Sequence, residues 1–278
     1  MALIQVNFIS QSLMRTVPIQ VILPVDKILF PGMPKREDKP FKTLYLLHGI
    51  FGNYTDWVCG TNIQKWAEEK DLAVVMPSGD NMFYVDQEAG HTYYGEFVGK
   101  ELVEITRKMF PLSHKREDTF IAGLSMGGYG AIRNGLKYHD TFGYVAGLSS
   151  ALITCGLLER TNDEPVFINR RDFAESIFGD LTLVKDSDKE PEWLVRKLRN
   201  EKADFPKMYM ACGTEDSLLG VNRRFRDVLK EAQVDLTYEE APGGHEWEFW
   251  NRYIKKVVDW LPVGEDAQAG INSGNVGV

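Results

Sequence analysis

Cysteine is scarce in this 278-residue chain, and its three cysteines, Cys59, Cys155 and Cys212, never form a CxxC pair. This pattern predicts neither a disulfide framework nor a zinc site, so we expect a reducing, cytoplasmic compartment. Positive charge is also in deficit, because 32 Lys and Arg face 40 Asp and Glu, which gives a net charge of −8. That balance argues against binding to nucleic acid or to anionic lipid.

Features of a membrane or secreted protein are weak as well. One uncharged stretch, residues 141–158, approaches the length of a membrane span, but it contains three glycines, two serines and two threonines. We interpret it as a buried strand that runs into a covered loop. The first fifteen residues lack a basic segment followed by a long apolar run, so we predict no signal peptide and no membrane partner.

Strand and helix patterns alternate along most of the chain. Short apolar or β-branched runs that end in turn residues predict strands at 18–24, 43–49, 72–79, 119–125, 144–150, 207–213 and 235–241. Helical patterns between them predict helices at 62–70, 96–110, 129–138, 221–232 and 248–261. Continuous apolar strands alternating with helices are typical of an α/β fold, with a mostly parallel sheet covered by helices on both faces.

Two regions depart from that alternation. Residues 151–204 are long, charged and poorly periodic, and we interpret them as a cap-like insertion over one end of the sheet, with a short helix or two. Residues 263–278 have no apolar face and are predicted to form a C-terminal tail. We therefore expect a single domain over residues 1–262.

A candidate nucleophile lies in the segment FIAGLSMGGYG, residues 120–130. Ser125 follows a predicted strand and precedes a helix, at the carboxyl end of the sheet where ligands bind in such folds. A serine on that sharp turn requires small residues two positions before and after it, and Gly123 and Gly127 occupy those positions. A strand-to-helix turn capped by a buried serine is the structural alternative.

A serine nucleophile requires a base, and five histidines are available. His114 and His139 lie beside charged residues in predicted surface turns, and His91 is assigned by default to a polar rim. His245 follows the predicted strand at 235–241 and a Pro-Gly-Gly turn, so it is expected at the same sheet edge as Ser125. The sequence HEWEF is not the zinc motif HExxH, because its fifth residue is Phe, and we predict no metal site.

An acid must orient the histidine, and Asp216 follows the predicted strand at 207–213. The adjacent Glu215 stays open as an alternative, although the spacing from the strand favours Asp216. The chain order Ser, Asp, His is that of α/β-hydrolases. For the oxyanion hole we predict the backbone N–H groups of Met126 and Ile50; the N–H of Phe51 is the near alternative to Ile50.

Four motifs together resemble the esterase D-like α/β-hydrolase family, with bacterial tributyrin esterases the nearest match. The motifs are HGIFGNYTDW, FIAGLSMGGYGA, CGTEDSLL and GGHEWEFW, and the resemblance covers about residues 5–262. It implies the same triad and oxyanion donors. Independently of the resemblance, the choice of Ile50 as a donor makes His48 a structural brace of that loop rather than a catalytic residue. The resemblance also implies a substrate pocket near Phe51, Trp57, Tyr84 and Trp247, whose aromatic rings could equally belong to the core.

The sequence therefore predicts a serine carboxylesterase for short-chain acyl esters that uses no metal or organic cofactor. Its expected partner is a small-molecule ester, and assembly as a closed homo-oligomer is common for such enzymes. The alternatives are an S-formylglutathione hydrolase, a feruloyl or acetyl-xylan esterase, and a catalytically inactive binding protein of the same fold. The serine motif reads GLSMGGYG where many S-formylglutathione hydrolases have GHSMGGHG, which disfavours the thioester.

Overall fold

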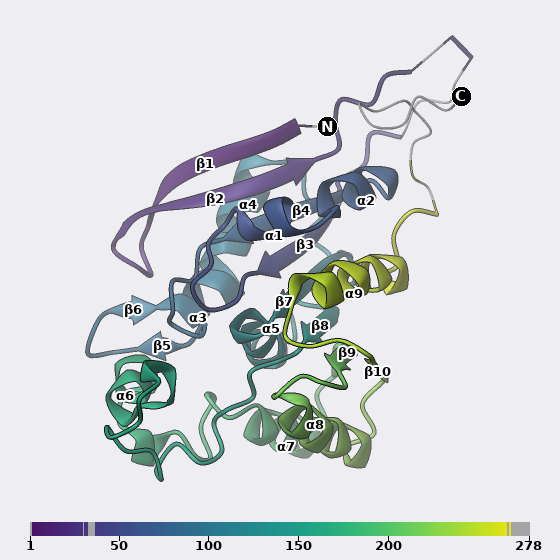
Figure 1. Ribbon diagram of the computed structural model, residues 1–278. Coiled ribbons are helices and arrows are strands. Elements are labelled where there is room, and N and C mark those ends of the chain that lie inside the picture. Colours follow the sequence, from purple (N-terminus) through teal and green to yellow (C-terminus); the bar gives the residue numbers. More distant parts are fainter. Residues whose placement is uncertain (1, 30, 33–36, 266, 268–278) are drawn as a thin grey trace.

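An eight-stranded sheet forms the centre of the molecule (Figure 1). The computed structural model describes residues 2–29, 31–32, 37–265 and 267. The strand order is β1-β2-β4-β3-β7-β8-β9-β10. Strands β1 and β2 pair antiparallel, as do β2 and β4, and all other neighbours are parallel. The strands are β1 (Ala2–Ser10), β2 (Arg15–Leu23), β3 (Lys42–Leu47), β4 (Leu72–Pro77), β7 (Thr119–Leu124), β8 (Tyr144–Leu148), β9 (Lys207–Gly213) and β10 (Leu236–Ala241).

The predicted α/β fold is confirmed, and each of the seven predicted strands is present. The prediction missed β1, which pairs with β2 along its whole length. Its signal was the alternation of side chains, because Ile4, Val6 and Phe8 pack against the core while their neighbours face solvent. A two-stranded hairpin of β5 (Asp86–Gln87) and β6 (Thr92–Tyr93) lies outside the main sheet.

Helices cover both faces of the sheet (Figure 1). One face carries α1 (Asp56–Gly60), α2 (Ile63–Glu69) and α9 (Trp247–Trp260). The other carries α4 (Leu102–Met109), α5 (Met126–Lys137), α7 (Pro191–Glu201) and α8 (Leu219–Glu231). The helix predicted at 96–110 is present as α3 (Tyr94–Glu96), a π turn (Phe97–Glu101) and α4.

The alternation of side chains along β3 separates two hydrophobic cores. Leu44 and Leu46 pack with the helices α2 and α9, whereas Tyr45 and Leu47 pack with α4, α5 and their neighbours. The central strands are therefore buried on both faces, which explains why their sequences are continuously apolar.

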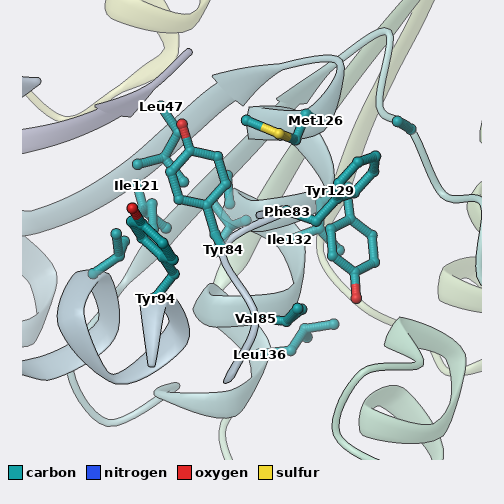
Figure 2. Close-up of a cluster of buried hydrophobic side chains, with 14 of the residues drawn as sticks. Leu47, Phe83, Tyr84, Val85, Tyr94, Ile121, Met126, Tyr129, Ile132 and Leu136 are labelled. Atoms are coloured by element: carbon teal, nitrogen blue, oxygen red, sulfur yellow. The ribbon is translucent and has the colours of Figure 1, made fainter. Parts of the chain in front are cut away.

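The core beneath the carboxyl end of β7 is rich in aromatic side chains (Figure 2). Tyr84 is fully buried there, and its hydroxyl donates a hydrogen bond to the carbonyl oxygen of His48 at 3.0 Å. Phe83 and Tyr129 pack edge to face beside it, at a centroid distance of 5.7 Å. This packing supports the loops on which the candidate catalytic residues stand.

The predicted insertion, residues 151–204, contains two α-helices, α6 (Arg171–Phe178) and α7. Helix α7 packs against α5 and α8 and so joins the helical layer, whereas α6 lies near the β5–β6 hairpin (Figure 1). Most of the predicted tail falls on residues 266 and 268–278, which lie outside the described part of the chain. Within the described residues, no helix combines the length and apolarity needed to cross a membrane.

Candidate active site

Ser125 stands on a sharp turn between β7 and α5, with φ 53° and ψ −117°. This backbone conformation is strained for a residue with a side chain. Glycine is required on both sides of it: an added Cβ at Gly123 would lie 2.3 Å from the carbonyl oxygen of Gly127, and one at Gly127 would lie 2.4 Å from that of Leu47. The turn thus has the geometry of a nucleophile elbow, in agreement with the GxSxG motif.

Three strand ends bring Ser125, His245 and Asp216 together. The Nε2 atom of His245 lies 2.9 Å from the Ser125 Oγ atom, and its Nδ1 atom lies 2.9 Å from the Asp216 Oδ2 atom. An ionised carboxylate can only accept a hydrogen bond, so Nδ1 carries the proton and Nε2 accepts one from the serine hydroxyl. This is the arrangement of a Ser-His-Asp triad.

Asp216 is held in its ionised form. Its side chain is completely buried, which opposes ionisation. Hydrogen bonds from His245 and from the N–H of Leu218, together with the Ser149 hydroxyl, outweigh burial and keep its pKa below the ordinary value. A buried carboxylate on the far side of the imidazole stabilises the imidazolium that forms when the serine loses its proton.

The neighbouring carboxylate, Glu215, points elsewhere. It accepts a hydrogen bond from the N–H of Gly243 at 2.6 Å and another from the Thr214 hydroxyl at 2.8 Å. Glu215 therefore stabilises the turn that precedes His245, and Asp216 is the carboxylate that contacts the imidazole.

Ser149 was not identified from the sequence. It follows β8, has a left-handed φ of 46°, and is fully buried. Its Oγ atom accepts a hydrogen bond from the indole Nε1 of Trp250 at 3.2 Å, and its hydroxyl helps to lower the pKa of Asp216. The available signal was its position directly after a strand at the same edge of the sheet as Ser125.

The loop after β3 is held by His48, which is buried. The N–H of Gly79 donates to its Nε2 atom at 2.8 Å, and its Nδ1 atom lies 2.6 Å from the carbonyl oxygen of Gly49. Burial lowers the pKa of His48 and so favours the neutral imidazole. His48 therefore fixes the loop that carries Ile50.

The backbone donors of this loop differ in availability. The N–H of Phe51 already donates to the Asn81 Oδ1 atom at 2.8 Å. Among the described residues, no hydrogen bond engages the N–H of Ile50 or that of Met126, and both residues line the same cavity as Ser125. Met126 is the first residue of α5, where N–H groups lack helical partners and the dipole favours negative charge.

A cavity of about 490 Å³ opens over Ser125 and His245. Phe51 and Trp247 line it, and Phe51 is 67% exposed; their contact with substrate stays a prediction. Trp57 and Tyr84 do not line it and are 1% and 0% exposed. Contrary to the prediction, these two side chains belong to the core: the Trp57 Nε1 donates to the carbonyl oxygen of Leu47 at 3.0 Å, and its ring packs on Trp247.

The remaining histidines lie away from this cavity. His91 and His114 are exposed, and His139 lies beside Asp140. In the part of the chain that the structure describes, no group of three or more His, Cys, Asp or Glu side chains could hold a metal ion.

Comparison with known proteins then decides the family. The model of the family described as "Putative esterase" matches residues 10–261. The chain belongs to this esterase family. A curated acetyl esterase of Caldicellulosiruptor saccharolyticus is 46% identical over 261 residues, which cover 94% of this chain and 98% of that protein. The predicted esterase resemblance is thereby confirmed, and this esterase is a carboxylic ester hydrolase.

Solved structures agree. A fluorophosphonate-binding serine hydrolase, FphF of Staphylococcus aureus, has a TM-score of 0.81 at 35% identity, over 94% of this chain and 98% of that one. The S-formylglutathione hydrolase FrmB of Staphylococcus aureus has a TM-score of 0.79 at 34% identity, with the same coverage. The α/β-hydrolase fold of this esterase follows from these likenesses together with its sheet order.

Proposed function

We propose that this esterase is a serine carboxylesterase that hydrolyses short-chain acyl esters through an acyl-enzyme on Ser125. The observation that carries the proposal is the pair of 2.9 Å contacts that connect Ser125, His245 and Asp216. A hydroxyl, an imidazole and a buried carboxylate in that order form the charge arrangement required for acyl transfer.

In the first half-reaction the Nε2 atom of His245 takes the hydroxyl proton of Ser125 as its oxygen attacks the ester carbonyl. The imidazolium, stabilised by Asp216, then gives this proton to the departing alcohol oxygen, and the acyl-enzyme forms. Water enters the second half-reaction, loses a proton to the same nitrogen and attacks the acyl carbonyl. Collapse of the intermediate releases the acid and restores the serine.

Negative charge on the carbonyl oxygen is stabilised by the N–H groups of Ile50 and Met126. Both line the cavity, and the hydrogen bond from the N–H of Phe51 to Asn81 favours Ile50 as the second donor. Loss of one such donor lowers kcat by about 10²–10³-fold.

The preference for short acyl groups is supported by the size of the cavity. Its volume of about 490 Å³ is in the lower half of the range of roughly 300–1,000 Å³ that is usual for small-molecule sites. The curated relative at 46% identity is named an acetyl esterase. A series of 4-nitrophenyl esters tests the preference: we expect kcat/KM to be highest at two to four acyl carbons, and a maximum at twelve or more would refute it.

A fluorophosphonate probe tests the nucleophile. We expect labelling of the native protein and none of Ser125→Ala, and equal labelling of both would disprove the role of Ser125. A thioester is the second candidate substrate, because a relative at 34% identity is an S-formylglutathione hydrolase. Assays on S-formylglutathione beside 4-nitrophenyl acetate separate the two. A cytoplasmic location and a homo-oligomer stay predictions from the sequence.

A further inference from the structure

Arg160 contributes a cation to the wall of the cavity that contains Ser125. It lies in the segment after β8, and Ile168 and Phe173 of the same segment line the cavity with it. The acidic side chain of this wall is Asp56, which comes from α1 and makes no ion pair with Arg160. The wall of the cavity therefore includes an arginine that no carboxylate of the same wall neutralises.

The guanidinium of Arg160 uses only part of its capacity to donate hydrogen bonds. Its Nη1 atom donates to the carbonyl oxygen of Ile168 at 2.9 Å, although a guanidinium has five N–H donors. Within the described residues, no carboxylate forms an ion pair with it, and burial lowers the pKa of Arg160 without a compensating anion. Nearby arginines differ: Arg170 pairs with Asp172 at 2.5 Å, and Arg171 pairs with Glu175 at 2.7 Å.

A half-buried guanidinium without an anion is unfavourable, because it loses hydration and gains no charge partner. A ligand that supplies a carboxylate removes this penalty and matches the planar fork of donors. The chain as a whole has a net charge of −8 and repels anions. Attraction of an anionic ligand to this cavity must therefore come from a nearby positive charge such as that of Arg160.

We propose that Arg160 recognises a carboxylate on the substrate, so that the preferred esters of this site carry a negative charge away from the scissile carbonyl. The proposal rests on the proposed esterase function of Ser125. The carboxylate belongs either to the alcohol part or to the acyl part of the ester. In both cases Arg160 binds it through charge-assisted hydrogen bonds.

Two pairs of esters distinguish these sources. For the alcohol part, 4-acetoxybenzoate is compared with its neutral methyl ester. For the acyl part, mono-4-nitrophenyl adipate is compared with its neutral methyl ester. Each pair is assayed with the native protein, Arg160→Gln, Arg160→Lys and the matched control Arg170→Gln, whose arginine forms an exposed ion pair outside the cavity.

We expect Arg160→Gln to lower kcat/KM for the charged member of one pair about tenfold or more, mainly through KM, because a hydrogen-bonded charge is lost. The neutral member should change by less than about threefold, Arg160→Lys should retain part of the preference, and Arg170→Gln should change neither member. Thermal unfolding of each variant reports whether the contact with Ile168 merely supports the segment.

An equal loss on charged and neutral esters would assign Arg160 to loop support and overturn the proposal. An unchanged preference in Arg160→Gln would also overturn it, as would a native protein that hydrolyses the neutral esters and ignores both charged ones. Failure of the native protein on every ester would instead refute the proposed esterase function, so the two failures are distinguishable.

Discussion

The Nε2 atom of His245 lies 2.9 Å from the Oγ atom of Ser125, although 120 residues separate them in the chain. The contact exists because β7 and β9 end at the same edge of the sheet and the turn after β10 brings His245 back over that edge. With Asp216 on its other nitrogen, the imidazole is fixed in one tautomer and one orientation. That pre-organisation predicts a strong dependence of activity on Asp216.

Asp216→Asn should lower kcat about 10⁴-fold, because an amide at this position favours the wrong tautomer of His245. Steady-state hydrolysis of 4-nitrophenyl acetate measures it. The matched control is Glu215→Gln, which keeps an oxygen that can accept from the N–H of Gly243 and should change kcat by less than about threefold. A control variant as impaired as Asp216→Asn would contradict the assignment of the acid.

Ser149→Ala should lower kcat about tenfold and leave KM nearly unchanged, because the buried Ser149 hydroxyl stabilises the ionised Asp216 carboxylate but does not line the cavity. Ser150→Ala is the matched control, since the buried Ser150 Oγ has no hydrogen-bond partner among the residues that the structure describes. Separate measurement of kcat and KM for both variants distinguishes positioning from a general loss of packing. Equal effects of the two substitutions would exclude a special role for Ser149.

Gly123→Ala should disrupt the turn at Ser125, because the new Cβ would lie 2.3 Å from the carbonyl oxygen of Gly127. We expect loss of most activity and a lower midpoint of thermal unfolding. Gly220→Ala is the control: an added Cβ there has nothing within 4 Å and lies in α8, so it should stabilise the protein by about 0.5–1 kcal/mol. An active, stable Gly123→Ala variant would argue against the strained turn.

Acid should destabilise the protein through carboxylates whose pKa is depressed by folding. Burial opposes ionisation of Asp188, but Arg133 and Lys137 outweigh it and lower its pKa, and hydrogen bonds from Arg223 and Tyr238 lower the pKa of Glu240 to about 2. Stability from a depressed pKa is present above the unfolded value and is lost as pH falls through the folded value. The free energy of unfolding should therefore decrease from about pH 4.5 towards pH 2.

Asp188→Asn tests whether the depressed pKa of one carboxylate contributes to the loss of stability in acid. Arg133 is completely buried and its Nη2 atom lies 2.5 Å from the Asp188 Oδ2 atom. The substitution should lower the free energy of unfolding at pH 7 by roughly 2–3 kcal/mol, because a buried charge loses its nearest partner while Asp86 stays at 3.6 Å. Urea unfolding from pH 7 to pH 3 measures it. If the free energy of unfolding of the variant depended on pH as that of the native protein does, Asp188 would not contribute to the acid destabilisation.

Local patterns in the sequence were sufficient for the strand and helix order and for the motif around Ser125. Continuous apolar runs and helical periodicity are properties of short segments, so they can be recognised in the sequence without knowing which distant residues are in contact. Strand β1 was missed because its alternating pattern has only one face against the core. Helix α5 begins at Met126 rather than at 129, because the strained Ser125 turn leads directly into it.

Which of two candidate residues has a given role in the site depended on the tertiary structure. The sequence by itself determined that a serine, an acid and a histidine occur at strand ends in hydrolase order. Only the fold decided that Asp216 contacts His245 while Glu215 binds Gly243, and that Trp57 is in the core while Trp247 lines the cavity. The reason is physical: the direction of a side chain in a loop is set by hydrogen bonds and packing with segments far away in the chain, which local patterns do not encode.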